Sequence, residues 1–452
     1  MTQEQAFTIL KTGANVFLTG EPGSGKTYIV NRYVAYLREQ GIETAITAST
    51  GIAATHIGGL TIHSWSGIGI KSKLGKQDLN KILSHKYITK RVSRAKVLII
   101  DEVSMLPSET LSMVDVVCRE IKNKSEPFGG MQIVFVGDFF QLPPIVKRED
   151  ENGEQSLLIK KTTVRFAYGS AVWARANLTV CYLTEQYRQD DGNFLSLLSA
   201  IRQNIFGSNH LRHIAAREIA ESKAPEGVPK LFSHNIDVDR VNGEMLAKIP
   251  SAPKKFEMFS QGASALVAGL KKGCLSPEKL FLKIGAAVMF TKNNLKEGFA
   301  NGTLGMVQGF NDYGYPIVRT RGGKSICVQP MDWTVEENGK VRGRIRQLPL
   351  RLAWAITVHK SQGMSLDEAV MDLSQVFEFG QGYVALSRVR RLSGLHLLGW
   401  NELTFQVDPE VIEKDKLFRE ASGEVEEEFS DISAVALQEM HESFIKVCGE
   451  KI

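Results

Sequence analysis

The segment Gly20-Glu-Pro-Gly-Ser-Gly-Lys-Thr27 constrains the fold of this chain more than any other feature. It lies between a short apolar stretch at 15–19 and a helical pattern at 28–39, which together predict strand, loop and helix. Glycines let backbone N–H groups surround a phosphate without Cβ clashes, and the helix N-terminus adds partial positive charge. The loop therefore predicts a nucleoside triphosphate site in an α/β fold, with these candidate ligands: Gly20, Glu21, Pro22, Gly23, Ser24, Gly25, Lys26 and Thr27.

Two further apolar strands end in polar groups suited to hydrolysis. Val97–Ile100 is followed by Asp101, which with the Thr27 hydroxyl can hold Mg²⁺, and by Glu102, which can polarise the attacking water. An Asp-Glu pair alone would also suit a helix N-cap. Gln132–Val136 precedes Gln141, which is placed to sense a γ-phosphate at the carboxyl end of its strand. Together these residues predict hydrolysis of Mg²⁺–ATP, with Lys26 on the β- and γ-phosphates.

Charge is unevenly distributed along the chain. The net charge is +5, but residues 409–452 hold twelve acidic and five basic residues, so the preceding part carries +12. A basic body favours a polyanion such as nucleic acid, although a solvated surface without a special role gives the same sum. The five cysteines are widely spaced, no apolar run approaches the roughly 20 residues of a membrane span, and the N-terminus has no signal-like pattern. We expect an intracellular, cytoplasmic protein without a membrane partner, associated with the nucleoid if it is bacterial.

The motifs at 20–27, 97–106 and 128–145 resemble those of superfamily-one helicases. Thr47–Ala54, continuing to Gly59–Ser64, narrows the resemblance to the Pif-type (petite integration frequency) helicases and their RecD-like relatives. Pro127–Gln132 and Ser108–Glu126 favour the Pif-type branch. Five later stretches agree in order: Leu183–Gln189, Val288–Phe310, Leu348–Ala355, Thr357–Gly363 and Gly380–Arg388. The resemblance covers about residues 3–405. It implies ATP-driven 5′→3′ movement on single-stranded DNA, with unwinding of duplexes, forks or G-quadruplexes.

The resemblance also implies ligand contacts beyond the phosphate loop. Gln5 is similar to the family's adenine-contacting glutamine, and Gly363 and Gln381 are implied as further nucleotide contacts. The implied DNA contacts are Thr50, Gly51, His63 and Ser64 in the first half and Thr357, His359, Lys360 and Ser361 in the second. Trp65 could stack on a base, although a lone tryptophan is more often a core residue.

Two arginines are candidates for charge delivered across the nucleotide cleft. Arg188 follows the apolar stretch at 180–183, and Arg388 begins a cluster with Arg390 and Arg391. A guanidinium that reaches the γ-phosphate stabilises transition-state charge, whereas a single arginine is otherwise usually a surface ion pair. Their positions in two family-like motifs favour the cleft, and closure of that cleft would couple hydrolysis to motion.

We expect an α/β fold with two RecA-like P-loop lobes built on parallel sheets. The first lobe is predicted at 1–182, with a small wedge insertion at about 66–81, and the second at 183–265 and 345–405. Glycine-rich turns predict a small β-barrel insertion at 266–344. The segment 406–452 is predicted to be an acidic C-terminal tail, and its Glu424–Glu428 run is predicted to be a solvated linker or a tail helix.

Two smaller patterns involve alternating arginines and a pair of histidines. Arg342, Arg344 and Arg346 alternate on one strand face, as either a DNA-facing stripe or a charged edge strand. His210-Leu-Arg-His213 lacks companion ligands, so we predict no metal other than Mg²⁺.

The predicted function is that of a DNA-stimulated ATPase that moves on single-stranded DNA and unwinds forked or tailed duplexes. G-quadruplexes are a further expected substrate and a single-stranded-DNA-binding protein a further expected partner. A RecD-like recombination motor subunit is one alternative, and it would unwind little without its partners. A P-loop regulator that uses ATP only as a switch is the other, and its ATPase would not respond to single-stranded DNA.

Overall fold

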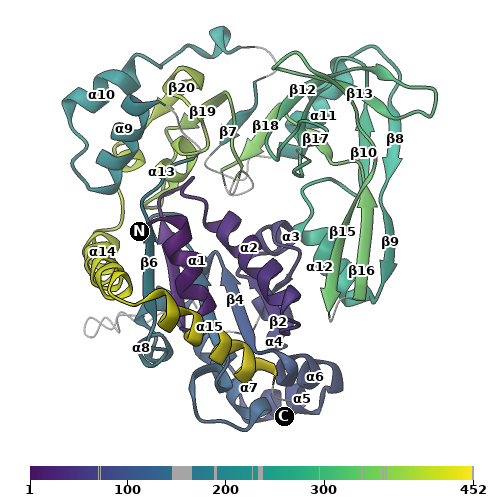
Figure 1. Cartoon of the computed structure of the whole chain (residues 1–452). Helices are drawn as coiled ribbons and strands as arrows, with labels where there is room; N and C mark the ends of the chain where they lie inside the picture. Colours follow the sequence, from purple (N-terminus) through teal and green to yellow (C-terminus); the bar gives the residue numbers. More distant parts are fainter. Residues whose placement is uncertain are drawn as a thin grey trace, which may run out of the picture.

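Two parallel β-sheets form the frame of the molecule (Figure 1). The computed structural model describes residues 1–69, 71, 73–144, 165–187, 191–225, 228–232, 238–294, 296–337, 340–358, 361 and 364–449. The sheet of the first lobe is parallel throughout, in the order β3-β2-β4-β5-β1-β6. Its strands are β1 (Val16–Gly20), β2 (Thr44–Ala48), β3 (Leu60–Thr61), β4 (Val97–Asp101), β5 (Gln132–Val136) and β6 (Thr179–Leu183).

Helices cover both faces of this sheet, which explains why its central strands are continuous apolar runs. Residues Val16, Leu18 and Val134 pack on one side with α1 (Gln3–Lys11) and α2 (Lys26–Glu39). Alternate residues such as Phe17 and Phe135 face the other side. That side is covered by α4 (Ile62–Ser66), α5 (Lys76–Ser84), α6 (Lys86–Arg94), α7 (Ser108–Lys122) and α8 (Ala171–Arg175), while α3 (Gly51–His56) follows β2.

The second lobe has a smaller parallel sheet in the order β18-β7-β19-β20. Its strands are β7 (Lys230–Phe232), β18 (Ala355–Thr357), β19 (Ala369–Leu373) and β20 (Leu395–Trp400). Its helices are α9 (Gly192–Arg202), α10 (Ser208–Ala215), α11 (Val238–Lys248) and α13 (Gln381–Leu386). The two parallel sheets confirm the predicted α/β class.

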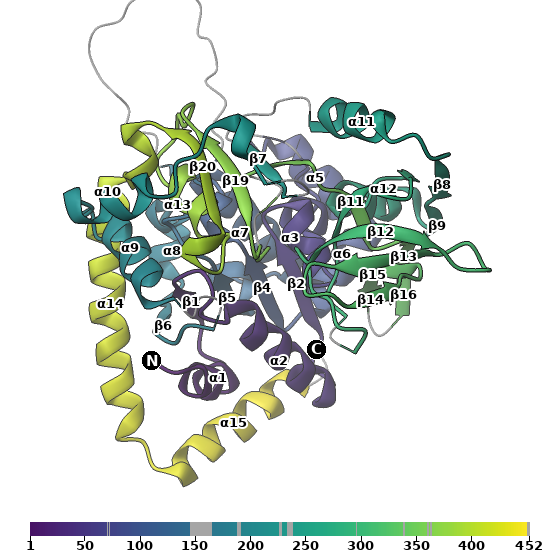
Figure 2. The ribbon, with the colours of Figure 1, turned by 90° about the horizontal axis from the view of Figure 1, so that it is seen from above.

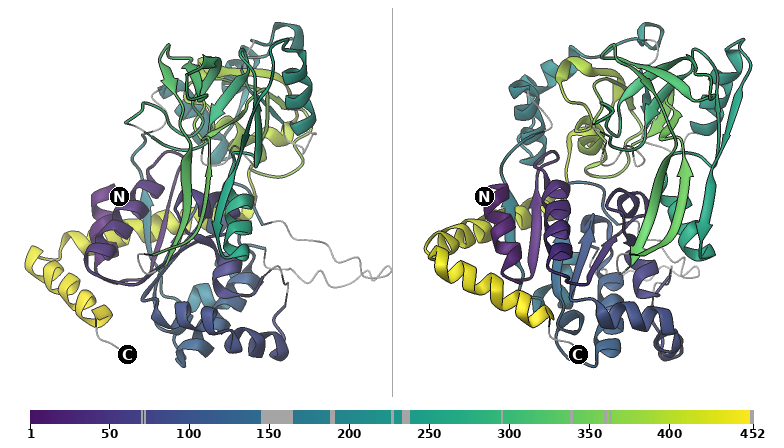
Figure 3. Two further views of the ribbon diagram at one scale, coloured as in Figure 1. Left: turned by 90° about the vertical axis from the view of Figure 1, so that its right-hand side faces the viewer. Right: turned by 45° about the vertical axis from the view of Figure 1, so that its right-hand side comes forward.

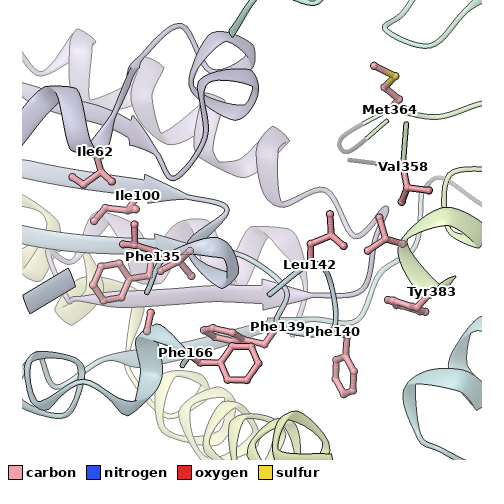
Figure 4. Packing of buried hydrophobic residues seen from close by; sticks show 14 of the residues in the cluster. Ile62, Ile100, Phe135, Phe139, Phe140, Leu142, Phe166, Val358, Met364 and Tyr383 are labelled. Atoms are coloured by element: carbon pink, nitrogen blue, oxygen red, sulfur yellow. The ribbon is translucent and has the colours of Figure 1, made fainter. Parts of the chain in front are cut away.

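One hydrophobic cluster continues from the first sheet into the second lobe (Figure 4). Phe140 and Leu142 extend from the loop after β5 toward Tyr383 of α13, with the Phe140 and Tyr383 ring centroids 6.5 Å apart. Val358 and Met364 of the second lobe belong to the same cluster. The lobes therefore share an apolar contact beneath the cleft that separates them.

The second lobe also carries an antiparallel region that is wider than predicted. It runs from Lys254 to Leu352 rather than over 266–344, because strands on both sides of that range pair within it. The described pairings give three open sheets, β14-β13-β12-β11-β17, β15-β16-β9 and β10-β8, rather than a closed barrel ladder. Its elements are β8 (Lys254–Glu257), β9 (Phe259–Gly262), α12 (Ser264–Gly273), β10 (Lys279–Leu282), β11 (Ala287–Phe290), β12 (Leu304–Phe310), β13 (Pro316–Thr320), β14 (Ser325–Cys327), β15 (Met331–Glu337), β16 (Lys340–Gln347) and β17 (Leu350–Leu352).

The arginine stripe on β16 fits neither of its two predicted roles in full. Strand β16 is the central strand of its sheet and not an edge. Arg344 and Arg346 both form ion pairs with Asp332 on β15, and these arginines hold the pKa of Asp332 well below its usual range. Only Arg342, which is exposed, keeps the character predicted for a nucleic-acid contact.

The acidic run Glu424–Glu428 lies in a helix with exposed glutamates, as one of its two predictions stated, but the C-terminal segment as a whole packs on the first lobe. It forms α14 (Pro409–Ser430) and α15 (Ala434–Gly449), which run along the first lobe (Figures 2 and 3). Phe418 packs against Phe17 and Trp173, and the Ser422 hydroxyl accepts a hydrogen bond from the Tyr182 N–H at 3.0 Å. Glu424, Glu427 and Glu428 lie on the exposed face of α14. The acidic composition of the segment therefore reflects only the outer face of the helix and not the face that packs on the lobe.

None of the helices that the structure describes combines the length and the apolar character needed to cross a bilayer.

Candidate nucleotide and DNA site

A cleft of about 1690 Å³ opens between the two lobes. Most of the predicted phosphate loop lines its first-lobe side, together with the ends of β4 and of the segment after β5. The second lobe contributes the segment that follows α13. The predicted hydrolytic residues that meet there are Lys26, Thr27, Asp101, Glu102, Gln141 and Arg388. Residues far apart in the sequence thus face one cavity.

The phosphate loop is formed around glycines that other residues could not replace. Gly20, Gly23 and Gly25 have φ values of +140°, +97° and +87°. A Cβ on Gly20 would lie 2.7 Å from the Leu183 carbonyl oxygen, and one on Gly25 would lie 2.0 Å from Nε2 of Gln3. Gly20 therefore needs glycine for space as well as for conformation, whereas Gly25 needs it for conformation, because the Gln3 side chain could move aside.

Two polar groups of the loop fit an anion. Lys26 Nζ donates to the carbonyl oxygens of Gly20 at 2.6 Å and Glu21 at 3.0 Å, so the ammonium lies inside the curve of the loop. Ser24 Oγ is buried without a hydrogen-bond partner. A triphosphate would supply acceptors to both groups, and the N-terminus of α2 points the same way.

Asp101 is buried at the end of β4, and Glu102, which follows it, is half-buried and lines the cleft. The Glu102 N–H donates to Asp101 Oδ1 at 2.9 Å, and Ser49 Oγ donates to the Glu102 carbonyl oxygen at 2.7 Å. Glu102 adopts φ +52°, a left-handed conformation that is uncommon for a residue with a side chain. Burial raises the pKa of both carboxyl groups, and the Lys26 charge opposes that rise. Two adjacent carboxyl groups with raised pKa values in a cleft, one of them on a left-handed backbone, are the environment of a catalytic carboxylate.

Arg388 brings a buried guanidinium to the opposite side of the cleft. Arg388 is only 1% exposed. Its Nε donates to the Val384 carbonyl oxygen at 2.8 Å, and its Nη2 donates to Ser387 Oγ at 2.9 Å. Burial lowers the pKa of Arg388 to about 10, and the nearby Glu102 carboxyl opposes this shift. The guanidinium therefore remains charged at neutral pH and is held in place by its own helix.

The structure places the two N-terminal glutamines in different surroundings. Gln5 closes a capping box with Thr2, and its Nε2 donates to Glu426 Oε1 at 3.0 Å, so it points toward α14. Gln3 instead donates from Nε2 to the Ser24 carbonyl oxygen at 3.0 Å. Gln3 is therefore the glutamine that contacts the phosphate loop.

The predicted DNA contacts are only partly at the surface. Thr50 caps α3 and lines the cleft, and Ser64 is exposed, but Trp65 is 4% exposed in the core, which contradicts its predicted stacking role. Thr357 and Ser361 are buried, and Ser361 Oγ donates to the Val358 carbonyl oxygen. His63 is partly buried, and burial lowers its pKa.

Helix α12 of the antiparallel region packs directly on α3. A Cβ on Gly51 would lie 3.3 Å from backbone atoms of Gly273, so the two helices approach closely at this predicted DNA contact.

Some predicted residues cannot be placed. Arg188, His359, Lys360 and Gly363 lie outside the described residues. Gln381 is fully buried at the start of α13, where its Oε1 accepts a hydrogen bond from the Phe377 N–H, and it does not line the cleft.

Sequence reasoning missed the residue that joins the two lobes. Arg202 at the end of α9 is buried and donates from Nη1 to Asp138 Oδ1 at 2.8 Å and from Nη2 to the Tyr182 hydroxyl at 2.8 Å. It also forms an ion pair with Asp415 of α14 and lies over the Phe140 ring. The only indication in the sequence was an arginine at the end of a largely apolar helix. An arginine in that position does not reveal which residue it pairs with.

These features define the class of the protein as a P-loop nucleoside triphosphatase whose cleft lies between two parallel-sheet lobes. Residues 2–207 match the PIF1-like helicase family. The chain is 40% identical to an ATP-dependent DNA helicase Pif1 from Psychrobacter sp. (strain PRwf-1), over 99% of this chain and 75% of that protein. It belongs to the PIF1-like helicase family.

Solved structures resemble the chain to different degrees. Bacteroides sp Pif1 in complex with ADP-AlF4 is 27% identical and gives a TM-score of 0.76, covering 92% of this chain and 96% of that one. Bacteroides Pif1 bound to ssDNA is also 27% identical but gives 0.60, covering 93% and 97%. The chain as a whole thus superposes more closely on the first structure than on the second.

Proposed function

We propose that this chain is an ATP-dependent DNA helicase that moves 5′→3′ on single-stranded DNA and unwinds forked or tailed duplexes. The observation that carries the proposal is the cleft in which Lys26, Glu102 and Arg388 meet from opposite lobes. The family relationship supports the DNA substrate, since the Bacteroides relative binds single-stranded DNA.

Each residue of the cleft has a distinct task in hydrolysis. The loop N–H groups and Lys26 bind the phosphates, and Glu102, half-buried and close to Asp101, accepts a hydrogen bond from the attacking water and takes its proton. Gln141 contacts the γ-phosphate region, and Arg388 neutralises charge that develops there. Thr27 and Asp101 would hold Mg²⁺, which supplies positive charge to the β- and γ-oxygens.

Coupling to movement follows from the division of these groups between lobes. Because Arg388 belongs to the second lobe, full neutralisation of the γ-phosphate requires the lobes to close, and loss of the phosphate removes that restraint. We propose that the conformation described here is the one without DNA, since α12 packs on α3 at Gly51 and the resemblance to the DNA-bound relative is weaker.

The test compares ATPase rates with and without a short poly-thymidine strand, and then unwinding of duplexes with only a 5′ or only a 3′ tail. We expect strong stimulation and preferential unwinding of the 5′-tailed duplex. Preference for the 3′ tail would overturn the direction. An ATPase that ignores the strand would indicate a switch protein, and stimulation without unwinding would indicate a RecD-like subunit that needs partners.

A further inference from the structure

A second groove, of about 450 Å³, lies on the first lobe away from the phosphate loop. Its walls are the end of α2, the turn before β3, helix α6 and the β15–β16 ribbon. Five basic side chains and one acidic side chain, Glu43, line it: Arg38, Lys90, Arg91, Arg94 and Arg342. Three separate parts of the chain therefore contribute positive charge to one concave surface.

Helix α6 carries three of these five basic side chains. Between Asp78 and Asp101 the sequence holds six lysine or arginine residues and no acidic residue. Lys86, Lys90 and Arg94 repeat every four residues and are all exposed, so like charges share one face of the helix.

An exposed aromatic ring completes the surface. Tyr87 on α6 lines the groove and is 46% exposed. Cations that follow a groove together with an exposed aromatic side chain are the combination that binds nucleic-acid backbones and bases. An acidic peptide would use the cations but gives no particular reason for the ring.

The groove adjoins the predicted path of DNA over the first lobe. Trp65, which follows His63 and Ser64, forms part of its wall, and Arg91 Nε donates to the Trp65 carbonyl oxygen at 2.7 Å. Arg91 also donates to the Ser64 carbonyl oxygen. The right panel of Figure 3 shows the long β15–β16 ribbon descending beside these first-lobe helices. A DNA strand that contacts Ser64 and continues across the first lobe would therefore contact α6 next.

We propose that this groove is a second nucleic-acid site, distinct from the track of the translocating strand. It binds the sugar–phosphate backbone of DNA ahead of the motor, either the duplex arm or the displaced strand. Lys90 and Arg342 contact phosphates from opposite walls, and Tyr87 contacts a base or sugar. The proposal rests on the helicase function, because only an unwinding motor meets both kinds of DNA at once.

The test is the double variant Lys90→Ala/Arg342→Ala, with Tyr87→Ala as a separate variant that leaves the charge unchanged. The matched control is Lys223→Ala/Lys248→Ala, which removes the same charge from exposed positions in the 3₁₀ helix Glu221–Lys223 and at the end of α11. Three DNA probes are used: a poly-thymidine strand, a 5′-tailed duplex, and the same duplex with an added 3′ flap.

We expect the groove variant to bind the flapped fork about tenfold more weakly at low salt, while the control binds normally. The slope of log affinity against log salt should fall by about 0.9 per duplex phosphate contact or about 0.7 per single-strand contact. Loss on both duplex probes assigns the groove to the duplex arm, and loss only with the flap assigns it to the displaced strand. Poly-thymidine-stimulated ATPase should be unchanged.

Three results would overturn the proposal. Unchanged fork affinity and salt slope would leave the groove without a DNA role. An equal loss on poly-thymidine would place it on the translocating strand's own track. Binding of a labelled poly-glutamate peptide that the variant loses, with fork affinity intact, would assign it to an acidic protein partner. If poly-thymidine did not stimulate the wild-type ATPase, the proposed helicase function itself would be wrong. Failure of the proposed function can therefore be distinguished from failure of the groove proposal.

Discussion

At the scale of single residues, Arg388 shows how the chain holds a charge out of water. Removing a guanidinium from solvent is costly, but the hydrogen bonds to Val384 and Ser387 and the attraction of Glu102 offset part of that cost. If Arg388 contacts the phosphate as proposed, a guanidinium held this firmly does not need to be recruited from the surface.

Arg388→Ala should lower ATP turnover by about a thousandfold or more, because the charge that stabilises the transition state is lost. Nucleotide binding, followed with a fluorescent ATP analogue, should remain measurable since the phosphate loop is intact. Arg212→Ala, at an exposed position on α10, serves as the control and should keep full turnover. Undiminished turnover in Arg388→Ala would remove the residue from the mechanism.

Gln3 and Gln5 offer a matched pair that tests which glutamine serves the nucleotide. Gln3→Ala removes the hydrogen bond to the Ser24 carbonyl oxygen, so we expect the KM for ATP to rise severalfold with a smaller change in kcat. Gln5→Ala removes the bonds to Thr2 and Glu426, and we expect a change in stability of about 1 kcal/mol or less and an unchanged KM. Steady-state kinetics of both variants decide the matter, and the reverse pattern would restore Gln5.

At the scale of elements, α14 functions as a structural part of the first lobe. Phe418 lies against Phe17, Phe139 and Trp173, and Ser422 accepts the N–H of an edge strand that no other strand covers on that side. Covering an exposed strand edge also protects it from pairing with another chain.

Phe418→Ala should lower the free energy of unfolding by about 3–5 kcal/mol, because it removes a buried aromatic side chain and leaves a cavity. The neighbouring Leu417 is 54% exposed, so Leu417→Ala should change it by about 0.5 kcal/mol or less. Urea unfolding of both variants measures the difference. Equal effects would mean that α14 does not pack on the lobe in solution.

The sequence predicted those elements whose local pattern and tertiary role agree. Strands β1, β4 and β5 are apolar because both faces are covered, and their polar end residues meet at one sheet edge, so Lys26, Asp101 and Gln141 could be found in advance. The packing of α14 on the first lobe could not be predicted, because the acidic outer face dominates the composition of this helix while few residues carry its packing. The limits of the antiparallel region were predicted wrongly for a related reason. Strands β8 and β9 have mostly exposed side chains, and they are strands only because they pair with β10 and β16, which are distant in sequence.

At the scale of the whole molecule, the lobes are joined beneath the cleft by one buried charged group. Arg202 of the second lobe reaches Asp138, which lies three residues before Gln141 in the first lobe, and also reaches Asp415 of α14. The hydroxyl of Tyr383, from the helix that leads to Arg388, accepts from the same guanidinium at 3.3 Å. The network therefore connects the segments of the two lobes that lead to the cleft residues Gln141 and Arg388, and it ties the C-terminal helix to them.

Arg202→Met keeps the length of the side chain but leaves the Asp138 carboxylate buried without its partner. We expect the free energy of unfolding to fall by about 3–5 kcal/mol. The double variant Arg202→Met/Asp138→Asn removes the stranded charge as well, so it should recover part of that loss in urea unfolding.

The double variant separates stability from coupling. If the network transmits closure between lobes, its poly-thymidine-stimulated ATPase should remain low compared with its basal ATPase, even where it is folded and binds the nucleotide analogue. Arg202→Lys keeps the charge and should restore part of the stimulation. Full stimulation in the double variant would mean that Arg202 and Asp138 only hold the lobes together, and that closure is transmitted through the apolar contact of Phe140 with Tyr383 instead.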